Sequence, residues 1–109
     1  LEAKARRLSD LFVTQVEARC PALTLASPRD ATARGSHVVF AHIQGYAIMQ
    51  ALIDRGVIGD FRAPDLIRFG FAPLYNRYEE MWRAADALAD ILDSGAWDQP
   101  HFHERARVT

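Results

Sequence analysis

Residues 36–71 read SHVVFAHIQGYAIMQALIDRGVIGDFRAPDLIRFGF, and the order of their apolar and turn-forming residues decides the fold. Residues 36–43 are rich in β-branched and aromatic side chains, which predicts a strand that ends before Gly45. Residues 46–55 carry apolar side chains at helical spacing, and Gly56 follows them where helices commonly end. The first half of the stretch therefore predicts a strand followed by a helix.

The second half of the same stretch predicts two more strands. Residues 57–62 and 66–71 are both largely apolar, and residues 63–65 between them are typical of a turn. Gly59 and Asp60 weaken the first of these two predictions, because both residue types are depleted in strands.

Helical patterns flank this stretch on both sides. Apolar residues three and four apart predict a helix from the start of the chain to Arg19, and Pro21 stops it. A short strand is predicted at residues 23–26. Toward the other end, Asn76 is placed to cap a last helix with a long apolar stripe, and Gly95 ends that helix.

The predicted order is helix, strand, strand, helix, strand, strand, helix. Three amphipathic helices need an apolar surface to cover, so we expect an α+β fold in which a small, antiparallel-type sheet carries the three helices on one face. Residues 1–95 are predicted to form this domain. Residues 96–109 are expected to be a C-terminal tail with partial order at best, because they show little periodicity beyond Trp97 and Phe102.

The composition excludes several function classes. The 109 residues carry 13 basic and 14 acidic side chains, a balance that gives no electrostatic footprint for nucleic acid or an anionic membrane. No apolar run approaches the roughly 20 residues of a membrane span. Cys20 is the only cysteine, so no internal disulfide is possible and a cytoplasmic location is expected, with Cys20 as a packing residue. The chain begins without methionine inside a predicted helix, which favours a segment cut from a longer protein.

One arginine interrupts an apolar strand pattern. Arg68 lies between Ile67 and Phe69, and a buried guanidinium without a partner is costly. Its planar fork suits a carboxylate, which it can bind through two parallel hydrogen bonds. Two interpretations remain open from spacing alone: Arg68 binds an anionic ligand, or it lies on the solvent face of its strand and pairs with Asp60 or Asp65.

The histidines give little support for a metal site. His101 and His103 alternate in the predicted tail, but no cluster of His or Cys completes a ligand set, so no metal is expected. His37 and His42 lie near the two ends of one predicted strand and on opposite faces, because their separation is odd. Polar edge or packing roles are expected for both, although His42 could also face a cleft. The sequence matches no P-loop, dinucleotide fingerprint, nucleophile elbow or zinc-protease motif.

A set of short blocks occurs in the order typical of one known family. The blocks are residues 27–30 (SPRD), 34–38 (RGSHV), 45–53 (GYAIMQALI), 55–62 (RGVIGDFR), 64–65 (PD), 67–70 (IRFG) and 73–75 (PLY). In these blocks the chain resembles the C-terminal small domain of kynureninases, which belong to the aspartate-aminotransferase-like class of pyridoxal-phosphate enzymes. Residues 41–44 (AHIQ) depart modestly from the family pattern.

The resemblance implies a function for the whole enzyme and a role for one residue here. The full-length enzyme would hydrolyse L-kynurenine or its 3-hydroxy form to anthranilate and L-alanine in tryptophan catabolism. Arg68 matches the family's arginine that binds the substrate carboxylate, and Arg62 matches a recurrent basic position to which we assign a supporting role. The resemblance also implies a homodimer whose active site draws on both subunits.

The same resemblance implies that the cofactor is bound elsewhere. Pyridoxal phosphate requires a lysine for its imine, and the only lysine, Lys4, lies in the first predicted helix without the family's context. We therefore expect no catalytic and no cofactor-binding residue in this chain, and we expect the isolated chain to be inactive.

Two other interpretations stay open. The chain could be the small domain of a cysteine-desulfurase-like or aminotransferase-like enzyme, in which a small-domain arginine also binds the substrate carboxylate. It could instead be a stand-alone binding module, and the length of the reading frame would separate that case from the others.

Overall fold

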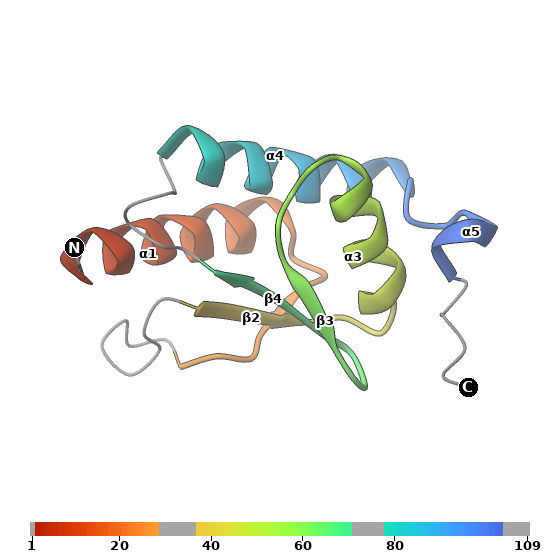
Figure 1. Cartoon of the computed structure of the whole chain (residues 1–109), viewed down its shortest axis with the longest axis horizontal. Coiled ribbons are helices and arrows are strands. Elements are labelled where there is room, and N and C mark those ends of the chain that lie inside the picture. The colour runs from red at the N-terminus through yellow and green to blue at the C-terminus, as the bar shows by residue number, and fades with distance from the viewer. Residues whose placement is uncertain (1, 29–36, 71–77, 104–109) are drawn as a thin grey trace.

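The computed structural model describes residues 2–28, 37–70 and 78–103 of the chain (Figure 1). The predicted cap at Asn76 and the PLY block at residues 73–75 lie outside the described residues. The elements are, in chain order, α1 (Glu2–Arg19), β1 (Thr24–Leu25), β2 (His37–Ala41), α3 (Gly45–Asp54), β3 (Asp60–Arg62), β4 (Leu66–Gly70), α4 (Tyr78–Ser94) and α5 (Pro100–His103).

The strands form one antiparallel sheet in the order β1-β2-β4-β3. The two five-residue strands, β2 and β4, form its centre, and the shorter β1 and β3 form its edges. In this register Arg68 lies opposite Val39 on one side and opposite Asp60 on the other. The predicted α+β class and antiparallel sheet are confirmed.

The helices α1, α3 and α4 lie on one face of the sheet, as predicted, and α5 packs against α3 (Figure 1). Because side chains alternate along a strand, Phe40 and Phe69 point toward the helices and are fully or almost fully buried. Phe12 of α1 packs on both, with ring centroids 6.2 Å from Phe40 and 4.8 Å from Phe69. This aromatic group joins α1 to the two central strands.

The two long helices, α1 and α4, pack side by side above the sheet (Figure 1). Each contributes buried apolar side chains to one core, among them Val16 from α1 and Leu88 from α4. Arg19 at the end of α1 forms an ion pair with Asp86 of α4 on the exposed rim. In this part of the chain no helix combines the length and apolarity needed to cross a membrane.

Two segments differ from the sequence-based expectation. The strand predicted at residues 57–62 begins only at Asp60, because the Val57 N–H is donated to the Leu52 carbonyl and continues the end of α3. The segment after Gly95 contains the short helix α5, and Trp97 and Phe102 pack against the core. Four helical residues are too few to produce a recognisable period in the sequence.

Candidate functional site

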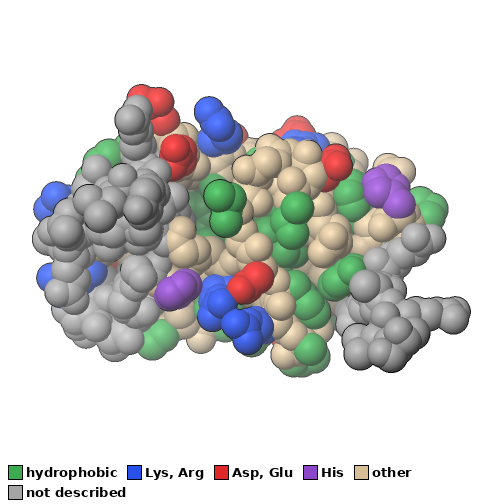
Figure 2. Space-filling model, in the orientation of Figure 1, with side chains coloured by type: hydrophobic (Ala, Val, Ile, Leu, Met, Phe, Trp, Pro, Cys, Tyr) green, Lys and Arg blue, Asp and Glu red, His purple; other side chains and the backbone are tan. Residues whose placement is uncertain are grey.

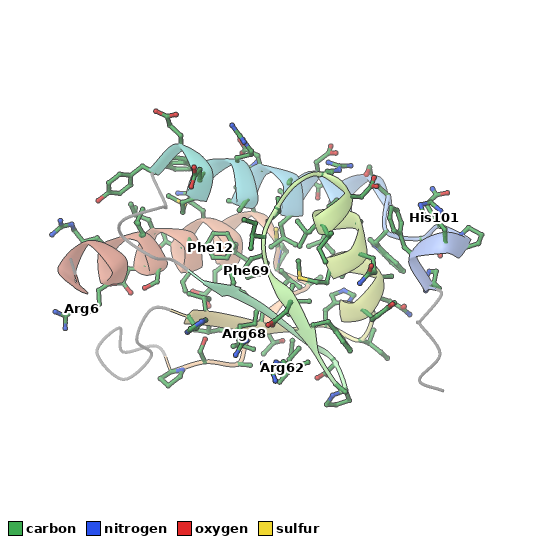
Figure 3. The ribbon with its side chains drawn as sticks, viewed as in Figure 1. Arg6, Phe12, Arg62, Arg68, Phe69 and His101 are labelled. Atoms are coloured by element: carbon green, nitrogen blue, oxygen red, sulfur yellow. The ribbon has the colours of Figure 1, made fainter. Side chains whose placement is uncertain are left out.

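The sheet has a second face that the described helices do not cover, and Arg68 lies on it. Along β4 the side chains of Leu66, Arg68 and Gly70 alternate with the buried Ile67 and Phe69. Figure 3 shows Phe69 with Phe12 between α1 and the sheet, and Arg68 on the opposite side of the sheet. The arginine that interrupts the apolar pattern therefore points away from the core.

Asp60 is the partner of Arg68 on this face. The Nε of Arg68 donates to Oδ1 of Asp60 at 3.1 Å, and Nη2 donates to Oδ2 at 2.7 Å. This is a bidentate contact between two residues that lie directly opposite each other on β3 and β4. Of the two acidic partners that the sequence allowed, Asp60 is therefore the one that binds Arg68.

Arg62 approaches the same carboxylate more loosely. Its Nε lies 3.9 Å from Oδ1 of Asp60, within ion-pair distance but beyond hydrogen-bond distance. The side chains of Arg68, Asp60 and Arg62 are 33%, 45% and 59% exposed, so solvent reaches all three. Two guanidinium groups share one carboxylate, which leaves an excess of positive charge at the surface (Figure 2).

The backbone around Gly59 explains why Asp60 and Arg68 meet. A Cβ built on Gly59 would lie 2.7 Å from the carbonyl oxygen of Arg68 and 3.0 Å from Cε of Met49. Only glycine lets the chain pass this close to β4 as it enters β3. Phe61 then faces inward, with its ring centroid 5.3 Å from that of Tyr46, so its neighbours in β3 face outward.

The guanidinium of Arg68 keeps donors that Asp60 does not use. A guanidinium carries five N–H groups, and the contact with Asp60 uses the edge formed by Nε and Nη2. The end formed by Nη1 and the second hydrogen of Nη2 is a separate two-donor edge of the same plane. This arrangement has the chemistry to bind one carboxylate of a small molecule.

The histidines lie in other surroundings. His42 is half-buried beside Trp97, its Nδ1 accepts a hydrogen bond from the Gln44 N–H, and burial lowers its pKa. His103 of α5 pairs with Asp98 at 3.1 Å and also contacts Trp97. The described residues contain no group of three or more His, Cys, Asp or Glu side chains that could hold a metal ion.

Two further predicted positions have structural environments. His37 begins β2 opposite Gly70, so its ring lies at the end of the open face rather than beside Asp60. Cys20 is buried at the end of α1, as expected of a packing residue, and burial is the main cause that raises its pKa. The grouping of Trp97 with two histidines was not foreseen, since it joins a loop and a short helix without a common sequence period.

Known proteins resemble this chain along its whole length. Residues 1–88 match the family model described as kynureninase C-terminal domain. A kynureninase from Pseudomonas fluorescens is 53% identical over 111 residues, which cover 100% of this chain and 27% of that protein. Kynureninases from Burkholderia mallei (strain SAVP1) and Burkholderia pseudomallei (strain K96243) are each 50% identical with the same coverage. The chain thus spans about a quarter of the length of these relatives.

Proposed function

The chain belongs to the kynureninase C-terminal domain family, and from this premise we propose that the full-length protein hydrolyses L-kynurenine or its 3-hydroxy form. Water and the substrate give anthranilate, or its hydroxy form, and L-alanine by cleavage of the Cβ–Cγ bond. The role of this chain is to bind the substrate carboxylate through Arg68. The observation that carries the proposal is a guanidinium on the sheet face that the described helices leave uncovered, with one donor edge that its contact with Asp60 does not use.

Binding the carboxylate fixes the orientation of the substrate. The fork of Arg68 can hold both oxygens in one plane, which a single point charge cannot do. A substrate held this way presents its labile bonds to the rest of the active site in one orientation, and such positioning is a major part of catalysis. Arg62 adds positive charge beside this position, and we assign it a supporting role.

The residues of this chain do not fit the site of the cofactor that the family implies. Pyridoxal phosphate, when bound, withdraws electrons from the substrate and needs a lysine for its attachment. Lys4 is the only lysine and belongs to the first turn of α1. We propose that the cofactor is held by other parts of the full-length protein, which we expect to be a cytoplasmic homodimer.

The test compares anthranilate release by the full-length protein and its Arg68→Ala variant. Loss of a charge-assisted bidentate contact should lower kcat/KM about a hundredfold. Arg83→Ala is the matched control, because it removes an exposed arginine from α4 on the other side of the sheet and should leave the rate unchanged.

The outcomes separate the parts of the proposal. An active parent whose Arg68→Ala variant is equally active would leave Arg68 with a structural role only. A parent that does not cleave kynurenine, but acts on cysteine or on simple amino acids, would favour a cysteine-desulfurase-like or aminotransferase-like enzyme. Absorbance of a cofactor imine on the 109-residue chain alone would contradict the proposal that the cofactor is held elsewhere.

A further inference from the structure

We infer that Asp60 is a positioning residue: its carboxylate holds the Nε–Nη2 edge of Arg68 and so orients the Nη1–Nη2 end toward the substrate carboxylate. The inference rests on the proposed function of Arg68. It adds a second residue, which contacts Arg68 and not the substrate.

The first support for the inference is that Asp60 binds only some of the N–H groups of Arg68. Asp60 binds Nε at 3.1 Å and Nη2 at 2.7 Å, which uses one of the two edges at which a guanidinium can bind a carboxylate. Two carboxylates can therefore bind one guanidinium in the same plane without competing for a hydrogen. Asp60 takes the edge nearest the Arg68 backbone, and the more distant end is left for a ligand.

The backbone geometry is the second support. Asp60 and Arg68 are directly paired residues on neighbouring antiparallel strands, so their positions are fixed by the ladder between β3 and β4. A free arginine side chain has several rotatable bonds and samples many directions. A short aspartate on a fixed strand restricts that freedom, because its side chain has little freedom of its own.

The local charge is the third support. Asp60 alone would neutralise Arg68 and weaken the attraction for an anion. Arg62, with Nε 3.9 Å from the same carboxylate oxygen, restores one unit of positive charge to the group. The three side chains together can hold Arg68 in place and still attract a negatively charged ligand.

The experiment measures steady-state kinetics of the full-length protein with L-kynurenine for Asp60→Ala and Asp60→Asn. Asp60→Ala should raise KM about tenfold with a smaller change in kcat, because a less firmly held Arg68 mainly weakens binding of the substrate carboxylate, which ground state and transition state share. Asp60→Asn keeps the size of the side chain and one oxygen acceptor, so a smaller rise is expected. Asp90→Ala is the matched control, since Asp90 of α4 forms a similar exposed ion pair with Arg55, which follows α3.

A double-mutant cycle with Arg68→Ala separates positioning from a general structural effect. Once Arg68 is absent, removal of Asp60 should no longer change KM, whereas a structural defect would persist. Melting temperatures of all variants accompany the kinetics, and they should stay within about 3 °C of the parent because the pair is partly exposed.

A rise in KM that disappears in the Arg68→Ala background supports the inference. An equal rise in both backgrounds, or an unchanged Asp60→Ala beside a strongly impaired Arg68→Ala, overturns the inference alone. An unimpaired Arg68→Ala overturns the proposed function of Arg68 and the inference with it.

Discussion

Replacing Gly59 with alanine should destabilise the domain and separate Asp60 from Arg68. The added Cβ would lie 2.7 Å from the Arg68 carbonyl oxygen and 3.0 Å from Cε of Met49. The methionine side chain can rotate away, but the carbonyl belongs to β4, which is paired on both sides. The contact must therefore be relieved by a shift of the backbone at the start of β3.

The magnitude follows from two opposing effects. Overpacking of this kind costs roughly 1–3 kcal/mol. Alanine also restricts the unfolded chain, which returns about 0.4–1 kcal/mol. We expect a net loss of about 1.3 kcal/mol, which lowers the melting temperature of a domain this size by about 5 °C.

The assay is thermal unfolding followed by circular dichroism, with Gly70→Ala as the matched control. Gly70 also lies in the sheet, but a Cβ there would only contact the His37 ring at 3.4 Å, so its melting temperature should change little. Ordinary surface substitutions change the melting temperature by up to about 2 °C. A Gly59→Ala variant that melts within that range of the control would refute the close approach of β3 to β4.

Three other predictions concern the core, the thiol and a histidine. Phe12→Ala should cost about 3–5 kcal/mol in urea unfolding, because the ring is fully buried between Phe40 and Phe69; a loss near that of a surface substitution would contradict this packing. Cys20 should react with a thiol reagent at least about tenfold more slowly in the folded protein than in urea, since burial raises its pKa; equal rates would contradict its burial. Burial lowers the pKa of His42, so its contribution to stability is fully present above about pH 6.5 and is lost as the pH falls through the folded-state pKa. The difference between the melting temperatures at pH 7.5 and pH 5.5 should therefore be smaller in His42→Gln than in the parent. An equal difference in both proteins would show that another group causes the pH dependence.

The sequence predicted the elements whose apolar spacing is long and regular. The central strands and the helices α1, α3 and α4 all follow from such spacing, and each occurs within a few residues of its expected position. The ends of the strands were harder to predict, because strand propensity does not distinguish a β-branched residue in a strand from one in a loop. Ile58 favours a strand by composition, yet it is 91% exposed and precedes β3.

The candidate site could be predicted only in part. Arg68 was identifiable because a charged residue inside an apolar strand needs a partner. The choice of Asp60 over Asp65 depends on the register between β3 and β4, and that register depends on the turn at residues 63–65 and the close approach at Gly59. Neither the turn nor the close approach leaves a periodic signal in the sequence. Only the three-dimensional structure could therefore identify Asp60 as the partner of Arg68.

The packing of α1 on α4 has a consequence for synthesis on the ribosome. Arg19 and Asp86, which join the two helices, are 67 positions apart in the sequence. At ordinary translation rates of about 5–20 residues per second, Asp86 of α4 is synthesised roughly 3–13 seconds after Arg19 of α1. During that interval the stripe containing Leu8, Phe12 and Val16 has no completed core to enter. Until α4 emerges, this stripe is therefore an exposed apolar surface of the kind that makes incomplete chains prone to aggregation.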